Sequence, residues 1–189
     1  MPFTSIDLCS RALTKIGAKS ISSFSEETAE ASVAEQLYTP TLEGLLSSHP
    51  WRFAVAQKEL VRLKDNPSAD FKYAYALPND FLRAISAGPA GRGKGLEYRL
   101  SGNQLHSNGQ SVLLTYLFKP SEYNFPPFFY RLVIAWLAAE FCLPLTESTS
   151  RTEYLQKMAQ DEFERAKLID SQQSVPSSFQ DFSLIEVRL

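Results

Sequence analysis

The sequence is poor in the residues that most often carry chemistry. Its 189 residues include only two histidines and two cysteines. Cys9 and Cys142 lie far apart among apolar neighbours at helical spacing, so we expect two buried, reduced thiols. His49 and His106 have no Asp, Cys or second His at ligand spacing, and the sequence has no nucleophile elbow. We therefore predict no catalytic residue, no metal and no cofactor, and a protein that is not an enzyme.

The sequence also lacks an excess of basic over acidic residues. Nineteen Lys and Arg residues face 21 Asp and Glu residues, which gives a net charge of −2. Proteins that work by binding nucleic acid usually carry a basic excess, because neutralisation of phosphates dominates their affinity. This balance argues against attraction of the whole protein to DNA. Hydrophobic residues make up 44% and charged residues 21% of the chain, a globular composition that can bury a core.

The patterns of a signal peptide and of a membrane span are also missing. The first residues, "MPFTSIDLCS", have no charged segment followed by an apolar one. The longest apolar run, residues 132–145, is interrupted by Glu140 and Pro144, which argues against a membrane span. We expect synthesis in the cytoplasm and no membrane partner.

Helical periodicity is present at the beginning of the chain. Apolar residues at helical spacing predict a first helix over residues 4–17. A second helix is predicted to begin near Ser23 or Ser25, because Ser23 and the acid three residues later have capping-box spacing. Pro40 should kink this helix, and Pro50 should end it, since the residue before a proline avoids the helical region.

Helical periodicity returns after residue 120. "FPPFFYRLVIAWLAAEFCL" opens with a proline pair that suits a first helical turn, and its wide apolar surface places this helix centrally. A last helix is predicted from the capping box of Ser150 and Glu153 to about Asp170.

Alternation of apolar and polar residues marks the middle of the chain. "DFKYAYALP", "GLEYRL" and "SVLLTYLFKP" alternate with a period of two, and Gly102-Asn103 and Asn108-Gly109 supply turns. We therefore predict an α+β, mainly α fold. Residues 1–50 and 121–170 should form a four-helix bundle, and residues 51–120 a small inserted antiparallel β-sheet.

The last residues, 171–189, are predicted to form an extended C-terminal arm. The polar linker "SQQSVPSSF" is followed by "FQDFSLIEVRL", which is too apolar for a solvated tail. A short apolar segment behind a linker cannot bury itself well alone, so we expect it to contact a partner chain as a strand or arm. The arm residues expected to make this contact are Phe179, Phe182, Leu184, Ile185, Val187 and Leu189.

The stretch "SSHPWRFA", residues 47–54, is predicted to be a structural corner between helix and sheet. Trp51 and Phe53 should share one face of an extended segment and anchor it to the helices, as Trp136 anchors the central helix. Arg52 should point the other way, toward solvent or a neighbouring chain. His49 is expected to help cap the last carbonyls of the helix.

The segment "GPAGRGKG", residues 88–95, nearly matches a phosphate-binding loop. It ends in Gly95 where that loop needs Ser or Thr, and a strand-like segment follows where the loop needs a helix. We interpret it as a basic loop of the sheet. A contact of Arg92, Lys94 and Arg99 with channel DNA or with an acidic partner surface is a hypothesis.

The order of several segments resembles a known family. The segments are "IGAKSISSF", "EETAEASVAEQLY", "LLSSHPWRFA", "YALPNDFLR" and "LAAEFCLPLTES". Together they resemble the head-to-tail adaptor proteins of tailed bacteriophages, which are similar to tail tubular protein A, over about residues 3–170. The most specific element is "HPWRFA" combined with "YALPNDFLR" at this distance.

The resemblance implies a structural protein of the virion, at the head–tail junction. Such adaptors form a ring, commonly dodecameric, beneath the portal protein, and the tail tube or nozzle docks on it. Genomic DNA passes through the central channel without being read. The arm would then contact the portal or a neighbouring adaptor. The alternatives are a DNA-binding packaging accessory, a tail-terminator protein, and a hydrolase that acts through His49.

Overall fold

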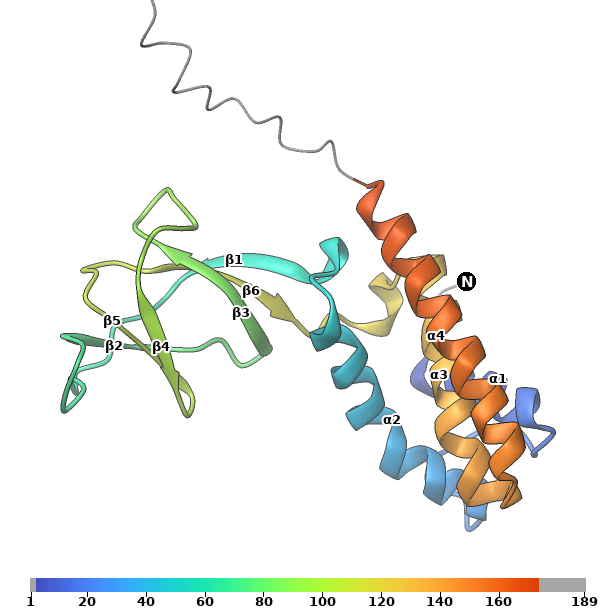
Figure 1. Cartoon of the computed structure of the whole chain (residues 1–189). Helices are drawn as coiled ribbons and strands as arrows, with labels where there is room; N and C mark the ends of the chain where they lie inside the picture. The colour runs from blue at the N-terminus through green and yellow to red at the C-terminus, as the bar shows by residue number, and fades with distance from the viewer. Residues whose placement is uncertain (1–2, 174–189) are drawn as a thin grey trace, which may run out of the picture.

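The computed structural model describes residues 3–173, so the predicted contact residues of the arm lie outside the described residues. Figure 1 shows a helical part and a β part side by side, with every labelled strand between α2 and α3 in the chain. The helices are α1 (Ser5–Ile16), α2 (Ala29–Ser48), α3 (Pro127–Thr146) and α4 (Thr149–Ser171). The strands are β1 (Val55–Glu59), β2 (Tyr73–Ala76), β3 (Phe81–Gly88), β4 (Tyr98–Ser101), β5 (Gln104–Ser107) and β6 (Leu113–Phe118).

The first helix forms as its sequence predicts. Thr4 caps α1 in a reciprocal capping box, in which its hydroxyl accepts the main-chain N–H of Asp7 and the Asp7 carboxylate accepts that of Thr4. Gly17 ends the helix in the left-handed conformation, with φ at 78°. Both ends of α1 are therefore fixed by local chemistry.

The second helix begins later than predicted. Thr28, not Ser23 or Ser25, caps α2 by accepting the main-chain N–H of Ala31. The Glu26 carboxylate does accept the N–H of Ser23, at 3.0 Å, but this bond holds a turn that precedes the helix. Pro40 lies inside α2, which continues past it as predicted.

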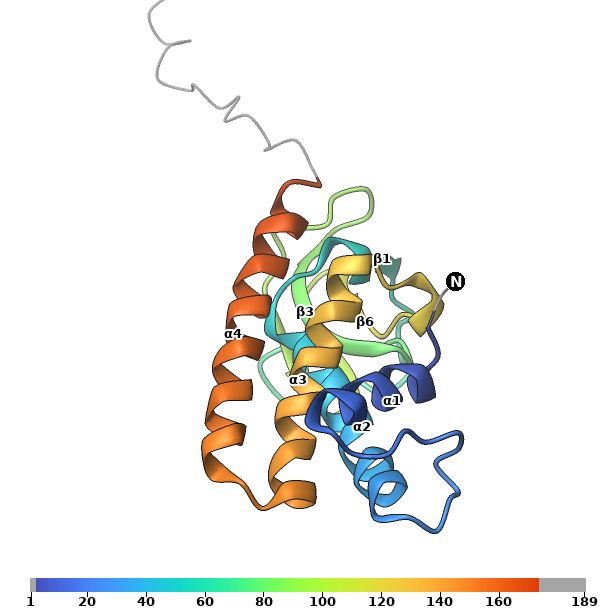
Figure 2. The same ribbon diagram turned by 90° about the vertical axis from the view of Figure 1, so that its right-hand side faces the viewer.

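The predicted four-helix bundle is wrong. α3 is the central helix and packs against α1, α2 and α4, whereas α1 and α2 touch each other only slightly. Figure 2 shows α4 lying along one side of α3, and α1 and α2 contact other sides of α3. The arrangement is a central helix with three neighbours. A closed bundle would need α2 and α4 to meet as well, and a groove described below separates them.

α3 is long and apolar enough to cross a membrane, by length and composition alone. Its most apolar 18-residue window is 56% buried inside the protein. Phe129, Leu132, Leu137 and Phe141 of this helix are completely buried against the other helices. Its apolar composition is accounted for by its central place in the helical core.

The predicted single small sheet is also wrong, because the β part holds two three-stranded antiparallel sheets. One has the order β1-β6-β3 and the other β2-β5-β4. The sequence pattern identified segments that contain β2, β6 and most of β4, but not β1, β3 or β5. β3 carries register shifts after Phe81 and after Ala84, so its alternation is broken.

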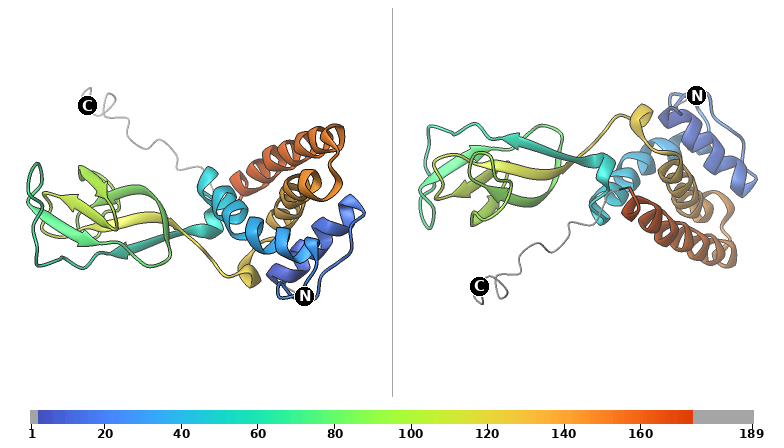
Figure 3. Two further views of the ribbon diagram at one scale, coloured as in Figure 1. Left: turned by 90° about the horizontal axis from the view of Figure 1, so that it is seen from below. Right: turned by 90° about the horizontal axis from the view of Figure 1, so that it is seen from above.

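Each part has its own hydrophobic core. The helical core gathers α1 to α4 with Trp51, Ala54 and Leu117, and the β core lies between the two sheets around Leu105 and Leu114. Figure 3 shows the two parts at opposite ends of an elongated molecule, joined where α2 leads into β1. Within residues 3–173, the residues where the two parts meet therefore set how the parts are oriented.

Candidate functional site at the helix-to-sheet corner

The corner begins where α2 ends. His49 follows the last helical residue with an extended backbone (φ −139°, ψ 145°), as the proline after it requires. The expected extended segment is instead a short 3-10 turn over Arg52–Ala54, which leads directly into β1. The N–H of Ala54 donates to the carbonyl of Trp51 at 2.9 Å and closes this turn.

Trp51 is completely buried at the corner and connects three helices, which agrees with its predicted anchoring role. Its indole Nε1–H donates to the Leu45 carbonyl of α2 at 2.8 Å. Its ring packs against Phe129 of α3 and Phe163 of α4, with centroids 5.2 and 5.8 Å away. The indole and the Ser48 hydroxyl, and not His49 as predicted, therefore satisfy a late carbonyl of α2.

Phe53, the second predicted anchor, also contacts the helical core. Its ring lies 4.9 Å from that of Phe129 and 6.0 Å from that of Phe125. The 3-10 turn brings Trp51 and Phe53 within 6.3 Å of each other, between ring centroids. The corner is thus held by a cluster of aromatic rings, whose large buried area dominates its packing energy.

Arg52 is exposed, as predicted, but it also bonds to the end of α4, which the sequence did not predict. Its main-chain N–H donates to both carboxylate oxygens of Asp170, at 3.2 and 3.3 Å. Its Nε–H donates to the main-chain carbonyl of Asp170 at 2.9 Å. Asp170 is only 1% exposed. Arg52 therefore ties the start of the β part to the last turn of α4.

His49 completes this group. Its Nε2 lies 3.7 Å from an Asp170 carboxylate oxygen, and its ring meets Trp51 edge-on. Burial lowers the pKa of His49, although the Asp170 charge acts in the opposite direction. Burial likewise raises the pKa of Asp170, against the hydrogen bonds from Arg52. In both groups desolvation outweighs the attraction of the opposite charge, so burial disfavours the charged form of each side chain.

Two serine hydroxyls near this pair are bonded elsewhere. The Ser48 hydroxyl donates to the Leu45 carbonyl at 2.7 Å. The Ser171 hydroxyl donates to the Leu168 carbonyl at 2.7 Å. Neither hydroxyl donates to His49 in this structure, so the His–Asp pair does not extend into the hydrogen-bonded row that nucleophilic catalysis requires.

Asp170 is the corner residue that sequence reasoning missed. The sequence pattern predicts Asp170 only as the approximate end of the last helix. One signal was available, because an acid in the last turn of a helix is unfavourable next to the partial negative charge there. Such an acid needs hydrogen-bond donors from elsewhere, and Arg52, 118 residues away in the sequence, supplies them.

An open groove of about 680 Å³ lies beside the corner. It runs along β1, where Val55, Ala56 and Gln57 line it. The end of α4 closes the other side with Ser171 and Gln173. The last described residue of the chain therefore lies in the same groove as the first residues of the β part.

A second, more apolar groove separates α2 from α4 over the surface of α3. Three adjoining cavities of about 510, 340 and 230 Å³ share Glu140 in their lining. Trp136, a predicted anchor, lines two of them and packs against Phe163 with ring centroids 6.0 Å apart. Unlike Trp51 it is only partly buried, so it anchors α4 from the edge of the core.

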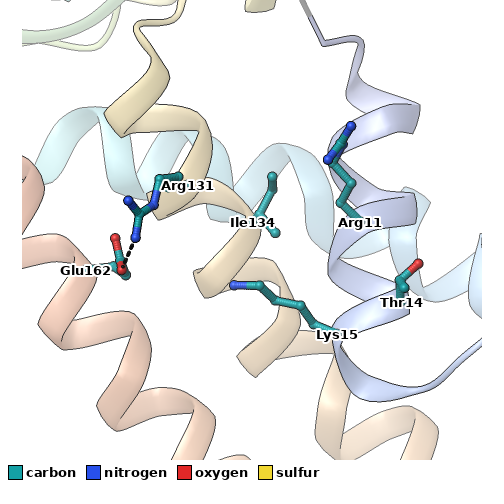
Figure 4. Close-up of a pocket in the computed structure, with 6 residues that line it drawn as sticks. All are labelled: Arg11, Thr14, Lys15, Arg131, Ile134 and Glu162. Atoms are coloured by element: carbon teal, nitrogen blue, oxygen red, sulfur yellow. Dashed lines mark hydrogen bonds and ion pairs between the residues drawn. The ribbon is translucent and has the colours of Figure 1, made fainter.

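A third cavity, of about 410 Å³, is basic and lies between α1, α3 and α4. Figure 4 shows Lys15 reaching across to Ile134, while Arg131 turns to Glu162. Arg131 pairs with Glu162 at 2.9 Å, and Arg165 approaches the same carboxylate oxygen at 3.3 Å. Arg11 also lines the cavity. The cations therefore outnumber the single acid that lines it.

The predicted basic loop is divided in the structure. Arg92 and Lys94 are exposed in the turn between β3 and β4. Arg99 lies on β4, where it pairs with Asp70 at 2.6 Å and lies over the ring of Phe71. Only Arg92 and Lys94 are brought together as neighbours in one turn, and the charge of Arg99 is matched locally.

The segment that nearly matched a phosphate-binding loop is a compact turn. The N–H of Arg92 donates to the Pro89 carbonyl at 3.0 Å, and the Ser86 hydroxyl donates to the Gly93 carbonyl at 2.7 Å. Gly91 and Gly95 have positive φ, at 78° and 101°. The segment leads into β4, so its main-chain N–H groups do not open a helix.

The remaining candidate ligands lie apart. Cys9 and Cys142 are buried free thiols as predicted, and burial raises the pKa of Cys9 to about 12. His106 lies on β5, where its Nε2 is 3.3 Å from the side-chain oxygen of Gln104. Within residues 3–173, no group of three or more His, Cys, Asp or Glu side chains is arranged to hold a metal ion.

No protein-family model matches the chain, and no curated protein matches it significantly in sequence. The resemblance to phage adaptors accordingly rests on the short segments quoted above.

Proposed function

We propose that this protein is a structural head-to-tail adaptor of a tailed bacteriophage. In this proposal, copies of the chain form a dodecameric ring that joins the portal to the tail tube or nozzle. Genomic DNA passes through the channel of the ring without sequence-specific binding. The protein acts in the virion after synthesis in the host cytoplasm, and its role is structural, not enzymatic.

The observation that carries the proposal is the place of the two most specific family-like segments. In "HPWRFA", Trp51 and Ala54 pack into the helical core, and Ala56, two residues beyond, packs against the β core. In "YALPNDFLR", Phe81 packs against the β core while Leu82 packs against the helical core. The first segment therefore packs on the helical core just before the chain enters the β core, and the second contacts both cores, so the resemblance falls on residues where the two parts meet.

Two contacts of Lys119 also support a rigid joint between the two parts. The main-chain N–H of Lys119, after β6, donates to the Asp80 carbonyl at 3.1 Å. The Lys119 ammonium group pairs with Glu43 of α2 at 2.9 Å. A ring subunit must present different surfaces to its two neighbours at a fixed angle, and a firmly held joint between two parts suits that requirement.

The proposal is tested by measuring the mass of the purified full chain alone and after mixing with the portal ring of the same phage. We expect a discrete complex in which many copies of the chain join each portal ring. A chain that leaves the portal mass unchanged at micromolar concentrations of both proteins would contradict the proposal. A monomer in the absence of portal is compatible with it, because a ring can require a template.

The arm is tested separately. We propose that residues 179–189 contribute the contact with the portal, so deletion of these residues should abolish the complex. Normal assembly of the deleted chain on the portal would contradict the arm contact while leaving the adaptor function in place.

A DNA-binding packaging accessory is the second candidate, and the basic cavity of Figure 4 favours it. That function predicts that the isolated chain binds a short DNA duplex with an affinity that falls steeply with salt. Lys15→Glu should then weaken binding, and Lys19→Glu, at an exposed position outside the cavity, serves as the matched control. Absence of salt-sensitive binding would dispose of this candidate.

A further inference from the structure

We propose that residues 182–189 of the chain add, within the same molecule, as a fourth strand to the free edge of β1. The inference concerns the isolated chain and does not rest on the adaptor function. It gives the arm a binding site on the protein itself, from which a partner would have to displace it.

The edge of β1 is open in the described structure. β1 is the outer strand of the order β1-β6-β3, and within residues 3–173 no strand except β6 pairs with it. The side chains of Gln57, Lys58 and Glu59 are exposed. An outer strand presents unpaired main-chain groups, which form a template for one more strand.

The register identifies which main-chain groups face that edge. The N–H of Leu60 donates to the Val112 carbonyl at 2.9 Å, and Lys58 and Ala56 pair with Leu114 and Tyr116 farther along. In an antiparallel ladder, hydrogen-bonded and non-bonded pairs alternate. Lys58 and Ala56 therefore bond to β6.

The main-chain groups of the residues between them point away from β6. By the same alternation, the N–H and C=O groups of Val55, Gln57 and Glu59 point away from β6. Val55 and Gln57 also line the open groove of about 680 Å³ beside the corner. The groove therefore runs along the side of β1 on which main-chain donors and acceptors are free to pair.

The chain itself leads into this groove. Gln173, the last described residue, lines it together with Val55 and Gln57. At about 3.4 Å per extended residue, Phe182 can lie up to ~30 Å from Gln173. β1 has 5 residues and so is roughly 17 Å long. The segment can therefore reach any point of the edge, in either direction.

The sequence of the segment suits an added strand. In "FSLIEVRL", Ile185, Val187 and Leu189 alternate with Glu186 and Arg188. This pattern gives one apolar and one charged face, as a strand at the border of a half-buried sheet requires. Main-chain hydrogen bonds supply the affinity in this mode of recognition, and the short tether raises the effective concentration of the segment to the millimolar range.

Amide hydrogen exchange measured by NMR on the full chain tests the inference. The variant carries Ile185→Pro and Val187→Pro, which remove two strand donors without touching the described fold. The matched control, Ser177→Pro, places a proline in the linker. We expect the Gln57 and Glu59 amides to exchange at least about tenfold faster in the double variant than in the wild type and the control. The amides of Ala56 and Lys58 should be unchanged, because they already bond to β6.

Two results would overturn the inference. One is equal exchange of Gln57 and Glu59 in all three proteins, together with no main-chain nuclear Overhauser contacts between β1 and residues 182–189. The other is protection that rises with protein concentration, because that would place the segment on a second molecule. Neither result bears on the binding of portal, which the mass measurement tests independently.

Discussion

The helical part and the β part of this molecule are stabilised in different ways. The helical core is built on a completely buried central helix face, with Trp51, Phe129 and Phe141 among its largest side chains. The β core is smaller, and its largest side chains are tyrosines with bonded hydroxyls. Tyr75 donates to the Gly109 carbonyl at 2.5 Å, and Tyr116 donates to Asp80 at 3.2 Å.

This difference shows that the two parts can unfold together only through the contacts that join them. Because the two cores are separate, each part can in principle open without the other. The contacts that couple them are the aromatic cluster at the corner and the ties between Arg52 and Asp170. We therefore expect substitutions at the corner to affect both parts, and substitutions within one core to affect mainly that part.

Trp51→Ala should have the largest effect. Removal of a completely buried tryptophan should lower the free energy of unfolding by about 3–5 kcal/mol. Chemical denaturation followed by circular dichroism measures this change. Trp136→Ala is the matched control, and it should cost less because Trp136 is only partly buried. An equal or larger loss at Trp136 would show that the corner is not the main anchor.

Leu105→Ala should separate the two parts. Leu105 is completely buried in the β core alone, so its truncation should cost roughly 2–5 kcal/mol there. Hydrogen exchange should become faster in β2, β4 and β5 while amides of α3 keep their protection. Leu132→Ala in the helical core is the counterpart, with the reverse pattern expected. Uniform loss of protection in both variants would mean that the molecule opens as one unit.

Asp170→Ala should have an intermediate effect. It leaves the main-chain N–H of Arg52 without its carboxylate acceptor in a mostly buried place, which should cost about 1–3 kcal/mol. Asp170→Asn keeps one acceptor oxygen and removes the charge whose burial raises the pKa of Asp170, so it should cost less. If the Asn variant were the less stable of the two, the carboxylate charge itself would be required at the corner.

The pH dependence of stability should show the smallest effect. Burial lowers the pKa of His49, so below its ordinary pKa of about 6.5 the unfolded chain binds a proton that the folded chain does not. The free energy of unfolding should therefore fall as pH drops from 7 toward 5. His49→Gln should reduce this slope, and His106→Gln should keep it. An unchanged slope in the His49 variant would contradict the burial of the imidazole at the corner.

Local chemistry explains what the sequence made predictable. The Thr4 cap and the left-handed Gly17 define α1 without reference to the rest of the molecule. The two buried thiols and the anchoring role of Trp51 also follow from residue type and neighbours. These features depend on the properties of one residue and its near neighbours in the chain.

Features that depend on distant partners were not predictable. Arg52 was expected to face away from the core, and it is exposed, but its bonds to Asp170 were not predictable because Asp170 lies on another helix. The division of the strands into two sheets was missed because alternating patterns do not say which strands pair with each other. Four patterns of helical spacing predict a bundle, but such patterns do not say which helices meet, and α2 and α4 leave a groove between them.

The symmetry of the complex with portal is the most direct test of the proposed function. Electron micrographs of the full chain mixed with the portal ring of the same phage should show a second ring on one end of the portal. Class averages should show one copy of the chain per position in a dodecameric ring, with an open central channel. Portal rings without added density, or chains scattered without a ring, would contradict the adaptor function.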